Sequence, residues 1–329
     1  MSTLDFLVQQ TMFFSIPLLI VALGGMFSER SGVINIALEG IMILGAFAGI
    51  FFINTFQQII PVNEENMVLW GKIGQPVLLL AVLVSMLTGV AVSSLHAFAS
   101  INLKANQIIS GTAINLLAPA LAIYVARTIR TVQGIPFSNQ FFINKVPLLG
   151  DIPFFGPMFF RNTYITTYLG FLILVLSAFF LYKTRFGLRL RSCGEHPQAA
   201  DSVGINVYAM RYTGVLLSGA LAGLGGLVFV IPTSVEFNPE VAGYGFLALA
   251  VLIFGQWRPW RILFAALFFG FMKAISSSYS GIDFMRGIPI PAYVYKMIPF
   301  IATLIVLAFS SKLSQAPKSA GVPYDKGRR

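Results

Sequence analysis

Apolar runs long enough to cross a membrane recur along almost the whole chain. A helix of about 20 apolar residues spans the roughly 30 Å hydrocarbon core of a bilayer. Runs of this kind predict spans near residues 6–27, 33–54, 76–100, 106–126, 163–182, 212–231, 242–256, 259–279 and 293–310. We therefore expect an all-α polytopic membrane protein with about nine transmembrane helices (eight to ten), forming one membrane domain over residues 1–310.

Two regions leave the number of crossings open. Only the string QWRPWR separates the runs at 242–256 and 259–279, and residues 127–162 are rich in Pro, Gly and Phe. Either region can contain a half-helix or an additional crossing, because non-helical backbone occurs at membrane depth where protein or a wet cavity surrounds it. The N-terminal string MSTLDFLVQQ lacks the basic n-region of a cleaved signal peptide, so the first run is expected to be a retained helix.

The composition agrees with a membrane protein and sets its expected orientation. Hydrophobic residues make up 57% of the chain and charged residues 10%, whereas about a quarter of a soluble protein is charged. The net charge of +10 is explained by basic loops retained on the cytoplasmic side, so nucleic acid is not an expected partner. Of 22 basic residues, one face receives Arg30, Lys104, Lys183, Arg185, Arg189, Arg191, Arg211, Arg258, Arg261, Lys312, Lys318, Lys326, Arg328 and Arg329.

That face is expected to be cytoplasmic, with the N-terminus outside and the C-terminus inside if there are nine spans. Residues 311–329 would form a basic cytoplasmic tail, and we expect this polar segment to be disordered or only loosely docked.

The long basic loop at 183–211 contains a helix signal. Pro197 suits a first helical turn, good helix formers follow it, and Gly204 is a natural stop. A short helix lying across the cytoplasmic face would offer a docking surface for a cytoplasmic partner. The alternative is an ordinary basic loop. The candidates for such coupling are Glu195, Pro197, Gln198, Ala199, Ala200, Asp201 and Gly204.

The string QAADSVG resembles the coupling motif of bacterial ABC importer permeases, in which two alanines precede a glycine, with Gln198 in place of the usual Glu. The surrounding TRFGLRLRSCGEHPQAADSVGI is similar to the corresponding loop of permeases for simple sugars and nucleosides. The resemblance extends to LGGMFSERSGVINIALEGIMILGAFAG, SGALAGLGG and GYGFLALAVLIFGQWRP, and so covers residues 20–50 and 183–270. The nucleoside branch is resembled most, and it is related to ribose and branched-chain amino-acid permeases.

This resemblance implies a permease subunit of the bacterial inner membrane that imports nucleosides or a related sugar-containing solute, with ribose or another simple sugar as the alternative. It also implies three partners: a second permease, homologous or identical; ABC ATPase subunits that bind ATP and Mg; and an extracytoplasmic solute-binding protein. No cofactor is expected on this chain.

Two helices carry polar stripes that are candidates for the solute pathway. In the second helix Gly32, Asn35, Glu39 and Met42 share one face. An ionised Glu39 facing lipid would cost about 2.5 kcal/mol or more, so this face should turn inward. With the fourth helix, the candidates are Asn35, Glu39, Gln107, Ser110 and Asn115. The alternatives are a buried structural carboxyl for Glu39 and interhelical packing for the amides.

Two further features lie in the later helices. Gly219, Gly223 and Gly226 have the spacing that lets another backbone approach closely, which favours packing. Lys273 lies well inside the eighth helix, where it either snorkels outward or meets an acidic partner, and its role is open.

Missing motifs argue against an enzyme. The chain has no glycine-rich loop ending in Gly-Lys-Ser or Gly-Lys-Thr, no HExxH pair and no G-x-S-x-G elbow. Cys193 is the sole cysteine, so neither an intramolecular disulfide nor a cysteine-based metal cluster is expected. The rival functions are a self-powered carrier that uses Glu39 or Lys273, and an intramembrane enzyme.

Overall fold

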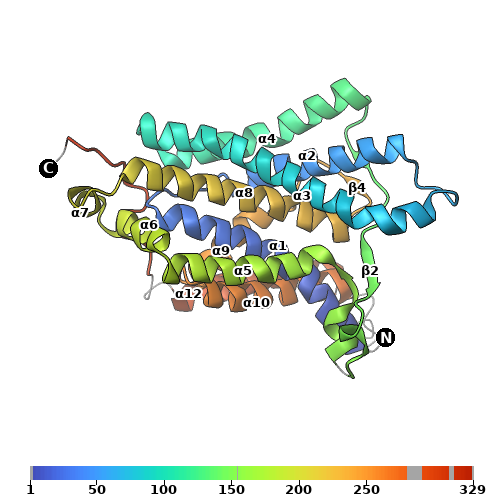
Figure 1. Cartoon of the computed structure of the whole chain (residues 1–329). Coiled ribbons are helices and arrows are strands. Elements are labelled where there is room, and N and C mark those ends of the chain that lie inside the picture. The colour runs from blue at the N-terminus through green and yellow to red at the C-terminus, as the bar shows by residue number, and fades with distance from the viewer. Residues whose placement is uncertain (1–2, 154, 280–290, 311–314, 328–329) are drawn as a thin grey trace.

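The computed structural model describes residues 3–153, 155–279, 291–310 and 315–327, and it is a bundle of long helices (Figure 1). The helices are α1 (Thr3–Arg30), α2 (Leu38–Ile59), α3 (Met67–Ala97), α4 (Gln107–Arg130), α5 (Ile165–Lys183), α6 (Arg185–Glu195), α7 (Pro197–Ser202), α8 (Val207–Thr233), α9 (Tyr244–Phe254), α10 (Pro259–Ser278) and α12 (Ala292–Ser310). Short helical turns lie at Phe98–Asn102, Leu149–Asp151 and Gly156–Phe160. The strands are β1 (Ile135–Pro136), β2 (Phe142–Lys145), β3 (Arg161–Tyr164) and β4 (Glu236–Phe237).

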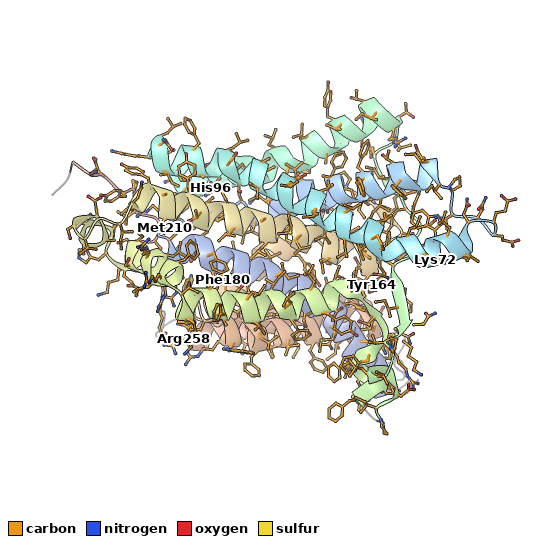
Figure 2. The ribbon with its side chains drawn as sticks, in the orientation of Figure 1. Lys72, His96, Tyr164, Phe180, Met210 and Arg258 are labelled. Carbon is orange, nitrogen blue, oxygen red and sulfur yellow. The ribbon has the colours of Figure 1, made fainter. Side chains whose placement is uncertain are left out.

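The bundle has two distinct ends. Figure 1 shows α6, α7 and the last residues of the chain at one end, which we call the α7 end. The N-terminus, β2 and the connection between α2 and α3 lie at the other end, which we call the N-terminal end. Arg258 lies at the α7 end and Lys72 at the N-terminal end (Figure 2).

Helices α1, α2 and α8 form the centre of the bundle. In the most apolar stretch of each helix, 83% of residues are buried in α8, 72% in α2 and 67% in α1, against 22% in α4. The other long helices surround these three and expose large apolar side chains such as Leu116 and Phe264. This arrangement suits a lipid environment, in which apolar side chains face outward as well as inward.

Seven helices within the described residues are long and apolar enough to cross a membrane: α1, α2, α3 with its π-helical extension, α4, α5, α8 and α10. The predicted spans at 6–27, 33–54, 76–100, 106–126, 163–182, 212–231 and 259–279 overlap them. The helical start expected at residue 33 is wrong, because residues 31–37 are non-helical and α2 begins at Leu38. The expectation of a full helical span at 242–256 is wrong, because α9 has 11 residues and rises only about 16 Å. The half-helix that the sequence left open is found here. Helix α12 has 19 residues and occupies the last predicted span.

Glycines bring α8 into backbone contact with two neighbours. A Cβ atom added to Gly223 would lie 2.3 Å from the Ser85 carbonyl oxygen of α3, and one added to Gly226 would lie 2.0 Å from the Met42 carbonyl oxygen of α2. Gly219 faces Gly89 of α3 in the same way. The packing role predicted for these three glycines agrees with this geometry.

The region between α4 and α5 holds only short elements and no additional long helix among its described residues. Strand β1 pairs antiparallel with β4, so that Ile135 lies opposite Phe237, and β2 pairs antiparallel with β3. These two small sheets cover the N-terminal end of the bundle and tie the segment before α9 to the end of α4.

Residues 315–327, which we call the strap, run across the α7 end and dock on it. The expectation of a loose tail is wrong for this part of the chain, because its backbone and side chains are bonded to elements far away in sequence. The bonds are Gln315 N to Gln256 Oε1 (2.8 Å), Ser319 N to Gly194 O (2.9 Å), Arg211 Nη1 to Val322 O (3.0 Å) and Lys104 Nζ to Asp325 Oδ2 (3.1 Å).

Candidate functional site

A non-helical segment, residues 31–37, connects α1 to α2 inside the bundle. Its midpoint is buried, since Asn35 is 0% exposed and donates a hydrogen bond to Ser218 in the middle of α8 at 2.9 Å. Helix α2 therefore begins inside the protein, where little water is available for the backbone. Each N–H and C=O of this segment needs a partner from the protein.

The polar residues predicted on α4 supply these partners together with a histidine of α3. Gln107 Oε1 accepts a hydrogen bond from the Ile34 N–H at 2.7 Å. The Ile34 carbonyl oxygen lies 3.0 Å from Nε2 of His96, and His96 Nδ1 lies 3.1 Å from Ser110 Oγ. His96 is completely buried, and it is not among the residues singled out from the sequence, because a histidine within an apolar run shows no partner in the sequence.

Asn115 holds the start of α2 with both ends of its side chain. Its Oδ1 accepts from the Gly40 N–H at 2.7 Å, and its Nδ2 donates to the Ile36 carbonyl at 2.9 Å. Asn35 adds a local bond, because its Oδ1 accepts from the Ala37 N–H at 3.1 Å. The predicted residues of the second and fourth helices thus converge on one stretch of backbone.

Glu39 holds the N-terminus of the half-helix α9. Its Oε1 accepts from the Gly243 N–H at 3.0 Å, and its Oε2 accepts from the Gly245 N–H at 2.6 Å. Gly243 has φ +76°, a left-handed conformation that a glycine adopts without strain. A carboxylate at this position suits both the free N–H groups and the positive end of the helix dipole. Two helices that begin inside the bundle, α2 and α9, therefore meet at Glu39.

These contacts occupy the polar atoms through which the five predicted residues would reach a solute, apart from Gln107 Nε2, which is buried without a partner among the described residues. The structure brings the five residues together. Whether any of them contacts a solute stays a prediction.

A cavity at the N-terminal end has a lining that the sequence did not single out. It encloses about 430 Å³ between α1, α8, α10 and the segment before α9, within the size range of small-molecule sites. Aromatic rings and polar groups face it together, among them Gln10, Phe13, Phe229, Glu236, Phe237 and Glu240. Lys273 and Ala242 line both this cavity and a second one of about 490 Å³ between α9, α10 and α12.

The predicted coupling helix is present as α7, with Pro197 in its first turn. Pro197 and Ala200 are buried, whereas Gln198 and Ala199 are exposed at the tip of the α7 end. Gly204 follows the helix with φ +83° and has no atom within 4 Å of the position of a Cβ. The stop at Gly204 therefore depends on backbone conformation rather than on close packing.

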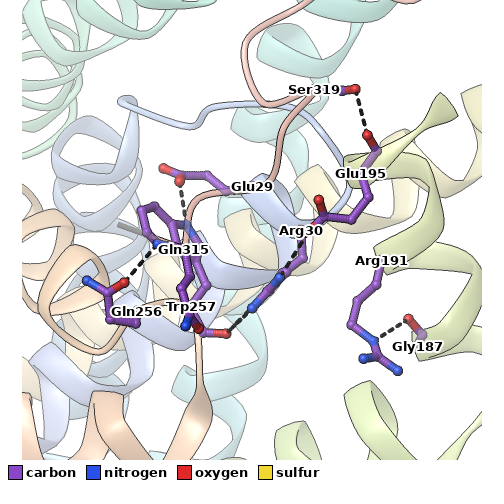
Figure 3. Close-up of polar contacts among 9 residues, drawn as sticks. All are labelled: Glu29, Arg30, Gly187, Arg191, Glu195, Gln256, Trp257, Gln315 and Ser319. Carbon is purple, nitrogen blue, oxygen red and sulfur yellow. Dashed lines mark hydrogen bonds and ion pairs between the residues drawn. The ribbon is translucent and has the colours of Figure 1, made fainter. Parts of the chain in front are cut away.

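The remaining coupling candidates connect α7 to the bundle and to the strap. Glu195 Oε1 lies 3.6 Å from Arg30 Nη1 at the end of α1. Arg30 also donates to the Trp257 carbonyl at 3.2 Å, and the Trp257 ring nitrogen donates to Glu29 at 2.6 Å (Figure 3). The carboxylate of Asp201 interacts with the hydroxyl of Tyr324 in the strap.

Chemistry other than binding has little support in the described residues. No group of three or more His, Cys, Asp or Glu side chains among them could hold a metal ion. Burial raises the pKa of the Cys193 thiol in α6, which makes a reactive thiolate less available at neutral pH.

Comparisons with known proteins identify the family. Residues 7–307 match the model of the permease component of branched-chain amino acid transport systems. The chain is 42% identical over 329 residues to the guanosine ABC transporter permease protein NupQ of Bacillus subtilis, covering 99% of this chain and 98% of the relative. It is 40% identical over 328 residues to the nucleoside ABC transporter permease protein NupC of Lactococcus lactis, covering 99% of each.

A second Lactococcus lactis protein, the nucleoside ABC transporter permease protein NupB, is 28% identical over 168 residues, covering 49% of this chain and 44% of that protein. No solved structure matches the chain. The predicted membership of an ABC importer permease family is confirmed, and with it the expectation of a transport subunit rather than an enzyme. The chain belongs to the permease components of the branched-chain amino acid transport family.

Proposed function

We propose that this chain is the membrane-spanning permease of an ATP-driven nucleoside importer in the bacterial inner membrane. The observation that carries the proposal is similarity over 99% of the chain to two proteins named as guanosine and nucleoside permeases. Similarity of this extent covers the solute route and the coupling region alike, so both are expected to serve the same class of solute.

The α7 end is proposed to face the cytoplasm, which places the N-terminus outside. Helices α6 and α7, the strap and most of the basic residues lie at this end, as the charge rule for membrane insertion requires. The chain then crosses the membrane nine times: seven times by the long helices, once by residues 234–254 with the half-helix α9, and once by α12.

ABC ATPase subunits, which would bind ATP and Mg, are proposed to dock on α7. The exposed Gln198 and Ala199 supply a small contact surface. Behind it, Glu195 connects to Arg30 at the end of α1. A push on α7 would thus reach a central helix of the bundle, and α1 leads directly into the non-helical segment before α2. Such a rigid connection suits a permease that alternates between outward and inward access.

The 430 Å³ cavity at the N-terminal end is proposed to receive the solute. Aromatic rings such as Phe229 offer a stacking surface for a base, and carboxylates such as Glu236 offer acceptors for ribose hydroxyls. An extracytoplasmic binding protein would deliver the solute to this end. A second permease, identical or homologous, would complete the route, and the partial similarity to NupB beside the full-length similarity to NupC fits two related permeases in one transporter.

The test is uptake by vesicles that contain the chain with its partner subunits. We expect ATP-dependent uptake of labelled guanosine. Ala199→Arg, which places a charged side chain on the exposed face of α7, should lower both ATPase association and uptake about tenfold or more at unchanged protein level. Leu103→Arg, in an exposed turn at the same end, is the matched control and should leave both intact.

Three results would contradict the proposal. Uptake of ribose or glucose without any nucleoside uptake would replace the substrate class. Normal uptake by Ala199→Arg would remove α7 from the docking surface. Uptake that survives ATP depletion and collapses with a proton uncoupler would indicate a self-powered carrier.

A further inference from the structure

A further cavity lies at the α7 end, apart from the proposed solute route. It encloses about 870 Å³ between the ends of α1, α5 and α6, the start of α10 and the first residues of the strap. Five basic side chains and a single acidic one face it: Arg30, Arg191, Arg258, Arg261, Lys318 and Glu195. The cavity therefore carries a formal excess of positive charge, which favours the binding of an anion.

Most of this charge is not neutralised within the described residues. Arg30 lies 3.6 Å from Glu195, but the exposed side chains of Arg258, Arg261 and Lys318 have no ion pair with an acidic group. Arg191 donates to the Gly187 carbonyl and stacks over the ring of Tyr182 at 5.0 Å, which holds its guanidinium beside the cavity (Figure 3). These groups are placed by the fold and do not form a loose charged tail.

The start of α10 adds backbone donors to the same cavity. This 20-residue helix begins with Pro259 after Arg258, and no side chain caps its first N–H groups. Free N–H groups and the positive end of the helix dipole together attract anions such as phosphate. The basic side chains and this helix terminus point to the same kind of ligand independently of each other.

Two exposed apolar stripes lead away from the cavity toward the middle of the bundle. Trp260 lines the cavity, and Phe264 and Phe268 follow it at helical spacing on α10, with exposed fractions of 55%, 69% and 37%. On the neighbouring helix α5, Tyr182 lines the cavity and Phe179, Val175 and Leu172 continue its face, all exposed. Phe271, also exposed, extends the α10 stripe, which rises about 16 Å from Trp260, close to half the thickness of the hydrocarbon core.

We propose that this basic cavity binds the phosphate headgroup of an anionic phospholipid of the inner leaflet, with its acyl chains along the exposed stripes of α5 and α10. A soluble anion would contact the basic groups but not the two stripes that continue from them, and an acidic surface of a partner protein would not extend down the stripes into the membrane. The inference rests on the proposed function only in placing the α7 end at the cytoplasmic leaflet, where anionic lipids attract basic groups.

The bound headgroup would stabilise the coupling region. Arg30 both lines the cavity and pairs with Glu195 just before α7, and the strap contributes Lys318 to the cavity and Ser319 to a bond with Gly194. An anion at this position would hold the ends of α1, α6 and α10 and the strap together, because it interacts with a basic group from each of them.

The test measures lipid binding to the purified full-length chain by native mass spectrometry. Phosphatidylglycerol, phosphatidylcholine and soluble glycerol 3-phosphate are titrated separately. We expect phosphatidylglycerol to bind in clear preference to the other two. The double variant Arg258→Gln/Arg261→Gln should weaken this binding by about 30-fold, from two basic contacts removed near a membrane surface.

The matched control is Arg185→Gln/Arg189→Gln, which removes two exposed arginines of α6 that do not line the cavity. It should change the affinity by less than about twofold. Equal loss in both double variants would overturn the inference, since it would indicate general surface attraction. Equal binding of phosphatidylcholine, or equally tight binding of glycerol 3-phosphate, would also overturn it, the latter by indicating a site for small anions.

A second measurement separates the lipid from a partner protein. If Arg258→Gln/Arg261→Gln abolishes ATPase association while lipid binding is unchanged, the cavity is a docking surface and the inference fails. Because lipid binding is measured on the chain alone, it can fail while nucleoside uptake succeeds, and it can succeed even if the transported solute is not a nucleoside.

Discussion

Asn115 and Glu39 illustrate how polar residues act at the scale of single side chains. Glu39 is buried and Asn115 half-buried, and both direct their polar atoms at backbone groups that a helix break has left free. A buried backbone N–H or C=O without a partner is costly, so a side chain that satisfies two such groups stabilises the break. The stripe of polar residues on α2 and α4 thus supports the irregular backbone between α1 and α2 and before α9.

Removing the Glu39 carboxylate tests this role directly. Glu39→Ala leaves the N–H groups of Gly243 and Gly245 buried without their acceptor, which should lower the free energy of unfolding by about 1–3 kcal/mol. Thermal unfolding of the purified protein in mild detergent measures the effect. Glu64→Ala, at an exposed carboxyl in the turn between α2 and α3, is the control and should unfold as the original protein does. An unchanged unfolding temperature for Glu39→Ala would rule out a capping role.

At the scale of elements, the strap and α7 form one unit. The ring of Tyr324 is 4% exposed and lies edge-on to Tyr208 of α8 with 5.4 Å between centroids. It packs in one apolar cluster with Cys193 of α6, Ala200 of α7 and Val207 of α8. The strap therefore covers the base of α7, so a substitution in one of them should alter the packing of the other.

The reactivity of the sole cysteine, Cys193, tests whether the strap covers this cluster. Burial raises the pKa of Cys193, so the reactive thiolate should be scarce in the native protein near pH 8 and maleimide labelling should be slow. Tyr324→Ala opens the cluster, lowers the pKa toward its ordinary value and should speed labelling about tenfold. Tyr324→Phe keeps the ring and should label slowly, as the original protein does. Equal rates for all three proteins would show that the strap does not cover Cys193.

The same pKa shift makes the stability of the folded state depend on pH. Because the folded-state pKa of Cys193 is raised, its contribution to stability is fully present below the unfolded pKa of about 8.5 and is lost as the pH rises from there through the higher folded-state pKa. The labelling profile should therefore steepen above pH 8.5 as local opening becomes easier.

At the scale of the whole molecule, α8 lies at the centre of the bundle and packs against α1, α2 and α3. Its glycines let α2 and α3 approach to backbone contact, as small residues do at helix interfaces in membranes. These contacts hold together the helices that surround the non-helical segment before α2. Helices α9 and α10 pack on α1 instead, so α1 and α8 together connect the two sides of the bundle.

A single added methyl group tests this arrangement. In Gly223→Ala the new Cβ would lie 2.3 Å from the Ser85 carbonyl oxygen, so the helices must separate, and we expect a loss of about 1–3 kcal/mol or more in unfolding free energy together with loss of uptake. Gly71→Ala, where no atom lies within 4 Å of the new Cβ, is the matched control and should stabilise α3 by about 0.5–1 kcal/mol. Equal stability of the two variants would contradict close packing at Gly223.

Hydropathy and turn chemistry determined much of this protein from the sequence alone. Long apolar runs have no stable alternative to membrane helices, so seven of the predicted spans coincide with long helices. Pro197 and Gly204 predicted a short helix by local backbone preference, which agrees with α7, and hydropathy placed Gln107 and Asn115 on a fourth helix. The helical stripe predicted through Gly32, Asn35 and Glu39 is wrong at its start, because residues 31–37 are non-helical.

The tertiary structure alone decided which distant groups the polar and basic residues contact. The apolar run at 242–256 reads as a span because hydropathy does not record where the backbone is helical, and the half-helix α9 exists because Glu39, more than 200 positions away, accepts hydrogen bonds from its first N–H groups. The docked strap and the basic cavity depend in the same way on contacts between distant segments. The neighbours of a polar or basic residue in the sequence do not reveal its partners in the fold. Only the packing of α1, α6, α8 and α10 decides whether such a residue has a partner in the protein or is free to bind a ligand.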